Sequence, residues 1–451
     1  MVDIVILLLL VVGIVLVTAK FKISPFLALL AAAFIGAFAF RLPADEVIPT
    51  ITTAFGNTMG NIGLVILFGT MIGVILERSG GAIAMADSLI KVLGSRFPTL
   101  TMSIIGYIVS IPVFCDSGYI ILNSLKKAMA ERAKASLVAM SIALMTGLYA
   151  THTMVPPTPG PLAAASNLKV VDSLGLLIGL GLVVAAVSAG VALLYANTFL
   201  KRDVELLDPP AEEVEVSYED LKREYGQLPS GFMAFLPIIL PILLICLASI
   251  AQLPGAPFGE AGFHGVVTFL GTPVVALALG LLAAVVLLRG KGKLERFNTQ
   301  IGDAILLAAP ILLITSAGAA FGGVLGKSSI TGFLSENLAT LGLGLAVPFI
   351  ISAALKTAQG SSTVAMVTTS AMLLPLLEPL GLAQGAGPVL AVLAIGAGAM
   401  VVSHANDSYF WVVSQFSRIP TATAYRTLTP ATGIQGVAGF AATWVLSLFL
   451  L

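Results

Sequence analysis

The strongest constraint on this chain is a series of long runs that contain no Asp, Glu, Lys or Arg. Ten runs have about the length of a membrane-spanning helix, which needs about 20 mostly apolar residues. They lie near residues 4–19, 23–40, 57–76, 136–168, 174–199, 232–252, 266–288, 304–326, 386–406 and 427–451. Only 10% of the 451 residues are charged, against roughly 25% in a typical soluble domain. The sequence therefore predicts an all-α polytopic membrane protein in a lipid bilayer, with about ten transmembrane helices.

The first apolar run is expected to remain in the protein as a membrane span. A secretory signal peptide has basic residues before its apolar core and small residues at a cleavage site. Here Asp3 precedes the core, and Lys20 and Lys22 follow it. This order favours a retained span over a cleaved signal peptide.

Two further apolar stretches, 97–125 and 340–377, are interrupted at their middle by polar residues. The first interruption is FCDSG at 114–118 and the second is KTAQGSS at 356–362. Few apolar residues remain between the first interruption and Lys126, so we expect that both stretches are re-entrant hairpins. Non-helical backbone at membrane depth persists only where it is buried in protein or lines a cavity. Two such tips therefore predict a binding site between them.

The distribution of basic residues predicts the orientation in the membrane. If the N-terminus lies outside and each hairpin returns to its own side, the outer loops hold only Arg41, Lys169 and Lys327. Apart from Lys356 in the second hairpin, all other Lys and Arg residues, including Lys126, fall on the cytoplasmic side. This asymmetry follows the positive-inside rule. It predicts both termini outside and a cytoplasmic linker at 201–230.

The linker divides the chain into two halves, 1–200 and 231–451, whose predicted elements follow the same order. Each half contains three spans, a hairpin, a broken span and a last span; the broken spans are 136–168 and 386–416. GVILERSGG in the first half is similar to GVLGKSSIT in the second. Each half crosses the membrane an odd number of times, so the halves are expected to be inverted repeats with two discontinuous helices. This arrangement is typical of secondary transporters.

The ionisable residues within the apolar stretches all fall at the four interruptions. They are Asp116, His152, Lys356, His404 and Asp407. A charge in the membrane interior costs at least about 2.5–3.5 kcal/mol, which makes such a residue a candidate for function. For the two histidines, a structural hydrogen bond is an equally good explanation.

Each broken span carries its own polar signature. The first, YATHTMVPPTPGPLAAA, contains Pro156, Pro157, Pro159 and Pro161, which remove N–H donors and forbid a continuous helix. A helix that stops there would expose Thr151, Thr153 and Thr158 to a substrate or ion; the alternative is a kinked structural helix. The second, SHANDSYFW at 403–411, adds Asn406. Its alternative is a buried polar network that holds helices together.

The hairpin tips offer a cation and several hydrogen-bonding groups. Lys356 is followed by Gln359, Ser361, Ser362 and Thr363, and the first tip contributes Ser117. Gly360 lets the backbone turn tightly. These groups suit a small anion that bears hydroxyl groups, unless Lys356 only pairs with Asp116 or Asp407. The two carboxyl groups could accept substrate hydroxyls or carry a coupling proton, because burial in general disfavours the charged form.

Several function classes lack support in the sequence. The net charge is zero, so nothing indicates nucleic acid, and Cys115 and Cys246 both lie in apolar runs. There is no clustered metal-ligand spacing, no nucleophile elbow and no Walker A motif. We therefore expect no metal, no cofactor, no ATP-driven transport and no enzymatic activity.

THTMVPPTPGPLA, QGSSTVA and SHANDSYFW resemble the gluconate permease family, the gluconate:proton symporters, over essentially the whole chain. The resemblance implies a secondary transporter of the bacterial inner membrane that imports a sugar acid or related hydroxy acid with protons. It also implies the architecture of the ion transporter superfamily, with scaffold and transport domains, usually a homodimer, and an elevator motion.

Three positions depart from the family pattern. The tip Phe114–Gly118 reads FCDSG where gluconate transporters have Phe-Tyr-Glu-Val-Gly, Lys356 replaces an Arg, and Thr158 replaces a His. A shorter acid and a single-point cation change the shape and hydrogen bonding of the site. Glycerate and D-serine are therefore alternatives to gluconate. Sodium is an alternative to protons, because hydroxyl groups and the carbonyl groups of a broken helix could hold it, and a passive facilitator is a third alternative.

These observations together predict a proton-coupled symporter of a small hydroxylated monocarboxylate. Lys356 is expected to bind the substrate carboxylate. The residues expected to bind the rest of the substrate are Ser117, Thr151, Thr153, Gln359, Ser361, Ser362, Thr363 and Asn406. Proton coupling is expected to involve Asp116, His152, His404 and Asp407.

Overall fold

The computed structural model describes most of the chain. The described residues are 2–19, 21, 23–94, 96–202, 206–207, 220, 223, 225–251, 262–288, 292–328, 344–404 and 407–451. Within them the backbone forms helices and turns and no strand. The expected all-helical class is confirmed for this part of the chain.

The helices of the first half follow one another with short connections. They are α1 (Val2–Ala19), α2 (Pro25–Ala39), α3 (Ala44–Arg78), α4 (Gly81–Leu93), α5 (Pro98–Val109), α6 (Cys115–Ala133), α7 (Leu137–Met154), α8 (Pro159–Asn167), the 3-10 turn η1 (Val171–Ser173) and α9 (Leu174–Asn197). Most of the linker 201–230 lies outside the described residues.

The second half is also helical in the residues that the structure describes. Its elements are α11 (Gly231–Ala251), α12 (Phe263–Leu270), α13 (Pro273–Val285), α14 (Lys293–Lys327), α16 (Ala346–Gln359), α17 (Ser362–Leu373), the 3-10 turn η3 (Leu374–Leu376), α18 (Gly387–Gly398), α19 (Ser408–Phe416) and α20 (Thr421–Leu450). The long helices α3 and α14 have 35 residues each and pack against one another.

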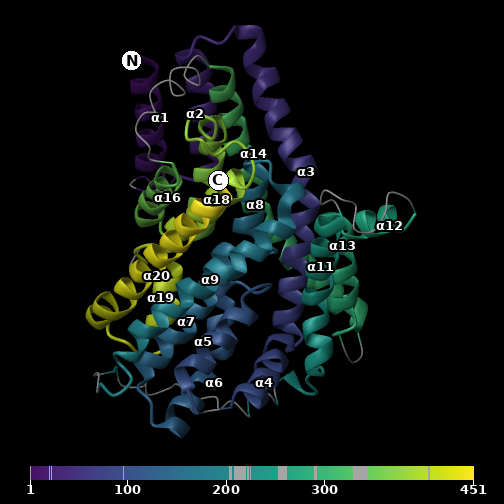
Figure 1. Ribbon diagram of the computed structural model, residues 1–451, viewed down its shortest axis with the longest axis vertical. Coiled ribbons are helices and arrows are strands. Elements are labelled where there is room, and N and C mark those ends of the chain that lie inside the picture. Colours follow the sequence, from purple (N-terminus) through teal and green to yellow (C-terminus); the bar gives the residue numbers. More distant parts are fainter. Residues whose placement is uncertain are drawn as a thin grey trace.

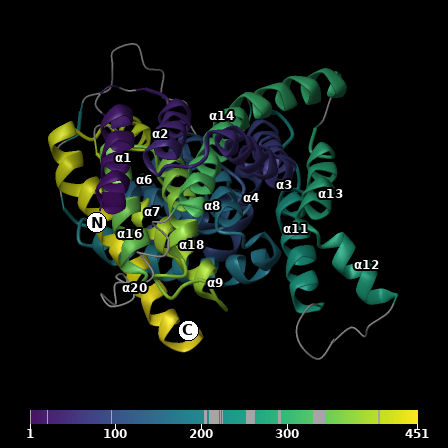
Figure 2. The ribbon, with the colours of Figure 1, turned by 90° about the horizontal axis from the view of Figure 1, so that it is seen from above.

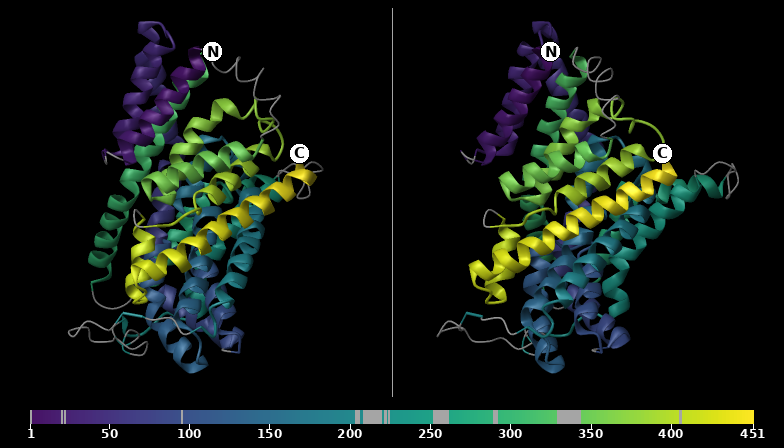
Figure 3. Two further views of the ribbon diagram at one scale, coloured as in Figure 1. Left: turned by 90° about the vertical axis from the view of Figure 1, so that its left-hand side faces the viewer. Right: turned by 60° about the vertical axis from the view of Figure 1, so that its left-hand side comes forward.

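The helices form one elongated bundle with a lateral extension. The helices α1 and α2 lie at the end of the molecule that holds the N-terminus, and α4 and α6 lie at the opposite end (Figure 1). Seen from above, α11, α12 and α13 stand to one side of the main body (Figure 2). The long helix α20 runs obliquely along the outside of the bundle (Figure 3).

Several helices of the described part are long and apolar enough to cross a membrane. Five meet this condition singly, and up to seven do so if two bent pairs each count as one span. Shorter apolar helices, among them α5, α16 and α18, belong to the interrupted stretches. The described helices support a multi-pass membrane protein, while the expected total of about ten spans stays a prediction.

The helix breaks lie at or directly before the polar interruptions. The α5–α6 turn occupies residues 110–114, α16 and α17 meet at Gly360 and Ser361, and α18 is separated from α19 by residues 399–407. Gly360 has φ of 87°, a left-handed conformation that glycine adopts without a Cβ penalty. The first hairpin was expected to span residues 97–125. The helix pair α5 and α6 is longer, because α6 continues to Ala133.

The four prolines of the first broken span divide into two groups. The helix α7 ends at Met154, and Pro156 and Pro157 lie in the short non-helical segment that follows. Pro159 and Pro161 lie in the first turn of α8, where a missing N–H leaves no intrahelical bond unmade. Only the first two therefore interrupt the helix, while the other two help to start the next one.

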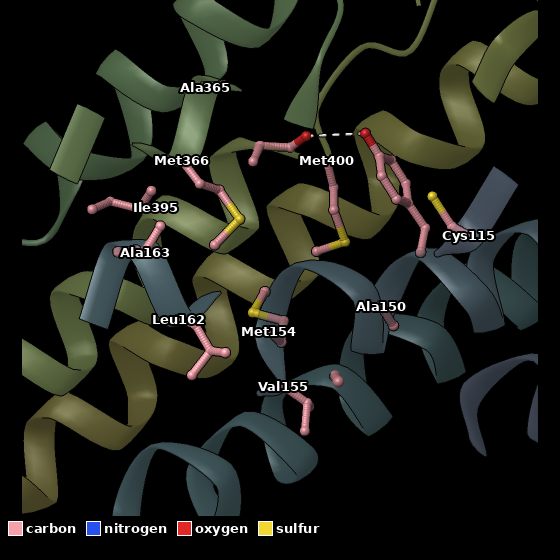
Figure 4. Packing of buried hydrophobic residues seen from close by; sticks show 14 of the residues in the cluster. Cys115, Ala150, Met154, Val155, Leu162, Ala163, Ala365, Met366, Ile395 and Met400 are labelled. Carbon is pink, nitrogen blue, oxygen red and sulfur yellow. Dashed lines mark hydrogen bonds between the residues drawn. The ribbon is translucent and has the colours of Figure 1, made fainter. Parts of the chain in front are cut away.

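The core around these breaks is filled by apolar side chains from both halves of the chain. Met154 of α7, Met366 of α17 and Met400, which follows α18, are fully buried there (Figure 4). Unbranched methionine side chains fill irregular gaps of this kind. At Gly106 and Gly147 the helices α5 and α7 touch through their backbones, since an added Cβ at either residue would collide with the other helix.

Candidate functional site

Four helices begin at the four interruptions and bring their N-termini together. These N-termini are Cys115 of α6, Pro159 of α8, Ser362 of α17 and Ser408 of α19. Ser408 Oγ donates to Asp116 Oδ1 at 3.3 Å, which joins α19 to α6. A Cβ added to Gly160 would lie 3.7 Å from Thr363, which places α8 beside α17. Helix N-termini carry unpaired N–H groups and partial positive charge, so this region favours an anion.

A buried ion pair lies at the centre of this region. Lys356 Nζ lies 2.6 Å from Asp407 Oδ2, and the two side chains are 0% and 5% exposed. The ammonium also donates to the carbonyl oxygen of Gly360 at 2.8 Å, across the break between α16 and α17. The pair thus connects the turn between α16 and α17 to the segment between α18 and α19. It is one of the two pairings that the sequence left open for Lys356.

Asp407 is held by further donors from its own segment. Its Oδ1 accepts from the backbone N–H of Tyr409 at 3.1 Å and so caps the N-terminus of α19. The hydroxyl of Ser403 donates to Oδ2, the same oxygen that contacts Lys356. Ser403 and Ser408 were not among the expected site residues, although both lie within the SHANDSYFW stretch.

Asp116 is the more accessible of the two carboxylates. It lies in the first turn of α6 and is only partly buried, whereas Asp407 is 4% exposed. Ser408 bridges them in the chain, because it donates to Asp116 and directly follows Asp407. The two acidic residues expected at the site, Asp116 and Asp407, therefore lie in neighbouring segments of the fold.

The two histidines occupy different environments. His152 is 4% exposed, its ring centroid is 5.8 Å from that of Phe114, and its Nδ1 has no hydrogen-bond partner among the described residues. His404 Nε2 lies 2.9 Å from the carbonyl oxygen of Thr357, which can only accept, so this nitrogen carries the hydrogen. The contact of His404 ties the segment before α19 to α16.

The three threonines of the first broken span already donate to backbone oxygens. Thr151 Oγ1 donates to Tyr107 O at 2.8 Å, and Thr153 and Thr158 donate to carbonyls of their own segment. All three side chains are buried. In this conformation their hydroxyl groups bond to the backbone rather than face an open space.

The second tip presents hydroxyl groups at three levels of exposure. Ser361 is exposed and caps α17 by accepting from Val364 N, Thr363 is partly buried, and Ser362 is 9% exposed. Ser117 of the first tip is also partly buried. The side chain of Gln359 and the whole of Asn406 lie outside the described residues.

A polar pocket of about 520 Å³ lies at the far ends of two of the converging helices. It is lined by Asn57 and Thr58 of α3, by Asn167 and Lys169 at the end of α8, and by residues of α14 and α17. The helices α8 and α17 therefore extend from the Lys356–Asp407 region to this open space.

Lys126, expected in a cytoplasmic loop, is completely buried. Its ammonium donates to Ser417 Oγ at 2.6 Å and to Tyr119 OH at 3.0 Å, and it lies 4.7 Å from the centroid of the Tyr119 ring. Ser141 of α7 also contacts Ser417, at 2.9 Å. This cluster fastens α6 to α7 and to the end of α19, which explains why α6 continues beyond the expected hairpin.

Replacing Lys126 with Ala is expected to lower the stability of the protein by about 1–3 kcal/mol. The substitution leaves a cavity and removes a donor from two buried hydroxyl groups. Melting of the purified protein in detergent would measure the loss, with Lys91→Ala as a control at an exposed lysine of α4. Equal melting temperatures for both variants would contradict a structural role for the Lys126 cluster.

Comparison with known proteins places the chain among transporters. The profile described as "GntP family permease" matches residues 2–449. An uncharacterized permease of Haemophilus influenzae is 37% identical over 88% of this chain and 82% of its own length. A gluconate permease of Pseudomonas aeruginosa is 31% identical over 98% and 96%, and the D-serine transporter DsdX of Escherichia coli K12 is 32% identical over 97% and 96%.

A solved transporter structure shares the fold. The YdaH transporter of Alcanivorax borkumensis aligns with a TM-score of 0.62, at 18% identity, over 90% of each chain. At this level of identity the likeness concerns the arrangement of the helices. The relatives and the solved structure are permeases and transporters rather than enzymes.

Proposed function

Because the chain belongs to the GntP family of permeases, we propose that it is a proton-coupled symporter in the bacterial inner membrane. It imports gluconate or a closely related hydroxylated monocarboxylate. The observation that carries the proposal is the buried Lys356–Asp407 pair, which lies where four helix N-termini converge. A cation and several helix N-termini together form a site for a carboxylate.

The substrate carboxylate binds Lys356, and its hydroxyl groups bind polar residues around the pair. Ser117, Ser361 and Thr363 are at least partly exposed and lie in the first turns of α6 and α17 or directly before α17. Carboxylate and hydroxyl oxygens of these residues can accept from or donate to a polyhydroxylated chain. Gln359 and Asn406 remain part of the proposed binding set by their positions in the sequence.

Coupling follows from an exchange of the counter-ion of Lys356. In the empty site, Asp407 neutralises Lys356. When a proton binds Asp407, Lys356 can pair with the substrate carboxylate instead, and the group of three remains neutral. Substrate without a proton would leave a buried net negative charge, which is costly. The loaded and empty sites can therefore move through the membrane, while the site with substrate alone is disfavoured.

The proposed architecture consists of two inverted repeats, 1–200 and 231–451, with both termini outside. The equal length of α3 and α14 and the paired helix breaks at 155–158 and 399–407 support it. A homodimer and an elevator motion of a transport domain are further parts of this proposal. They rest on the resemblance to the superfamily.

D-serine is the second candidate substrate. The relative named as a D-serine transporter is as similar to this chain as the gluconate permease of Pseudomonas aeruginosa. D-serine has one carboxylate for Lys356, one hydroxyl, and an ammonium group that Asp116 could bind. The short Asp116, in place of the family's Glu, leaves room for either ligand.

Uptake into proteoliposomes tests the proposed function. With an inward proton gradient, the protein is expected to accumulate gluconate above equilibrium, and a proton uncoupler should abolish the accumulation. Unlabelled glycerate and D-serine as competitors would rank the substrates, and replacing sodium in both buffers would test sodium coupling. Uptake that never exceeds equilibrium would overturn symport and indicate a facilitator.

A further inference from the structure

The polar pocket at the far end of α8 contains a single charged side chain. The pocket has a volume of about 520 Å³ and is lined by residues of α3, α14 and α17 as well as by the end of α8. Small-molecule sites typically have volumes of roughly 300–1,000 Å³. Among the described residues that line the pocket, Lys169 is the only charged one, and none is acidic. An anion in this pocket therefore meets an attractive charge and no repelling carboxylate.

Lys169 is available to a ligand. Its side chain is exposed, and it forms no ion pair with another residue of the described part of the chain. Lys327, another basic residue expected outside, is already paired with Glu46 at 2.8 Å. Asp172 follows Lys169 closely in the chain but does not line the pocket. Lys169 also lies just beyond the C-terminus of α8, where a cation stabilises the helix, so a measurement must separate this role from ligand binding.

The pocket wall also offers hydrogen-bonding groups. Asn57 is exposed and Thr58 is partly buried, and both line the pocket from α3. Asn167 is 6% exposed, and its Nδ2 donates to Ser370 Oγ at 3.0 Å and to Val367 O at 3.2 Å. Its buried Oδ1 has no hydrogen-bond partner among the described residues. Because buried polar atoms generally have a partner, a hydroxyl group of a bound ligand is a suitable donor for this oxygen.

The pocket is separate from the region around Lys356 and Asp407. The helix α8 has nine residues, which span roughly 12–14 Å at about 1.5 Å per residue. Its N-terminus lies beside Thr363 of the second tip, and its C-terminus lies at the pocket. In the proposed orientation, Lys169 is on the outer side of the membrane. The pocket is then at the end of α8 that an incoming substrate meets first.

We propose that this pocket is an outer capture site for a small hydroxylated carboxylate. Lys169 binds the carboxylate of the incoming substrate, and Asn57, Thr58 and Asn167 bind its hydroxyl groups, before the substrate reaches Lys356. The inference rests on the proposed function and orientation. A cation at an entrance raises the local concentration of an anion. Lys169 therefore governs the KM of uptake, whereas the Lys356–Asp407 pair governs transport itself.

A charge series at Lys169 tests the capture site. Initial rates of uptake of the preferred substrate are measured in right-side-out membrane vesicles. Lys169→Gln is expected to raise the KM about three- to fivefold, the scale of one partly exposed charge contact, with little change in the maximal rate. Lys169→Glu should raise the KM further, and Lys169→Arg should resemble the unsubstituted protein. High salt should reduce these differences, because it screens exposed charges.

Arg41→Gln is the matched control for this series. Arg41 is also an exposed basic residue expected outside, and it has a similar left-handed backbone, with φ of 60° against 57° for Lys169. It does not line the pocket. The KM of this variant should equal that of the unsubstituted protein.

A thiol in the pocket gives a readout that does not depend on transport. Asn57→Cys should react with an impermeant thiol reagent added from outside, beyond the labelling of the unsubstituted protein, and substrate should slow the reaction. This protection should persist when Lys356→Ala is added and should be lost with Lys169→Gln. Thr52→Cys, which is exposed on the same helix but does not line the pocket, should react equally with and without substrate.

The outcomes distinguish the inference from the function on which it rests. An unchanged KM across the charge series, in variants that melt normally, would overturn the capture site and leave Lys169 with a role in α8 alone. Protection that disappears with Lys356→Ala, or labelling of Asn57→Cys from the cytoplasmic side only, would also overturn it. If Lys356→Ala does not fold, the charge series decides. If the unsubstituted protein takes up none of gluconate, glycerate and D-serine, the proposed function itself fails, and the capture site fails with it.

Discussion

Replacing Lys356 with Ala is expected to reduce substrate uptake by at least about 100-fold. The substitution removes the only cation that pairs with Asp407 in the described part of the chain. Truncating one member of a buried, hydrogen-bonded charge pair costs about 2–5 kcal/mol in binding, and 2.7 kcal/mol corresponds to about 100-fold. Uptake of the preferred substrate into proteoliposomes, normalised to the amount of inserted protein, would measure the loss.

The same substitution is expected to destabilise the fold, so activity needs a matched control. Breaking a buried ion pair by removing one partner costs about 3–5 kcal/mol, because it leaves an unpaired buried charge. The double variant Lys356→Met with Asp407→Asn removes both charges and keeps similar volumes. It should recover most of the melting temperature that Lys356→Ala loses, yet it should transport nothing.

Recovered transport in the double variant would contradict the assignment. It would mean that the pair only holds the second hairpin against the second broken span. Lys356→Arg gives a complementary measurement, because it restores the cation of the family pattern with a planar, bidentate head group. We expect it to retain transport and to change the ranking of gluconate against D-serine.

The helix breaks at residues 155–158 and 360–361 have local causes that can be recognised in the sequence. Consecutive prolines at 156 and 157 cannot continue a helix, and a glycine at 360 supplies the left-handed turn between α16 and α17. Such effects act within a few residues and can be recognised without knowledge of the fold. Pro159 and Pro161 were also expected to interrupt the helix, but they lie in the first turn of α8. A proline is tolerated there, which is an equally local effect.

The pairing of charges could not be predicted in the same way. Two acidic residues at the other helix interruptions, Asp116 and Asp407, are possible partners of Lys356. The sequence alone does not say which one forms the ion pair. The choice of Asp407 depends on how residues 51 positions apart are packed. The burial of Lys126 is a stronger case, because its partner Ser417 is 291 positions away. Positive-inside reasoning treats a lysine next to an apolar segment as solvated, and it cannot detect such a partner.

The threonines show a third limit of reasoning from composition. A hydroxyl beside a proline break can serve either a ligand or the backbone of the break itself. Thr151 donates to the carbonyl of Tyr107 on α5, and buried hydroxyl groups generally require such a partner. Competition for hydrogen bonds within the fold therefore decides which polar residues remain available to a substrate.

Replacing Asp116 with Asn is expected to separate proton coupling from substrate movement. Asp407 is almost completely buried, whereas Asp116 is partly exposed and is linked to the neighbouring Ser408 by a hydrogen bond. Under the proposed coupling, we therefore expect a proton from water to reach Asp407 through the carboxyl group of Asp116. Asn has nearly the same size but cannot bind and release a proton at neutral pH.

In proteoliposomes, Asp116→Asn should still exchange internal for external substrate but should not accumulate it under a proton gradient. The expected loss is at least tenfold in the accumulation ratio, because the proposed coupling requires protons to enter together with the substrate. Ser408→Ala is the matched control, since it removes the hydrogen bond to Asp116 and leaves the carboxyl group in place. Accumulation that survives in Asp116→Asn with unchanged pH dependence would assign the proton route to another group, and His404, which contacts the second hairpin, would be the next residue to replace.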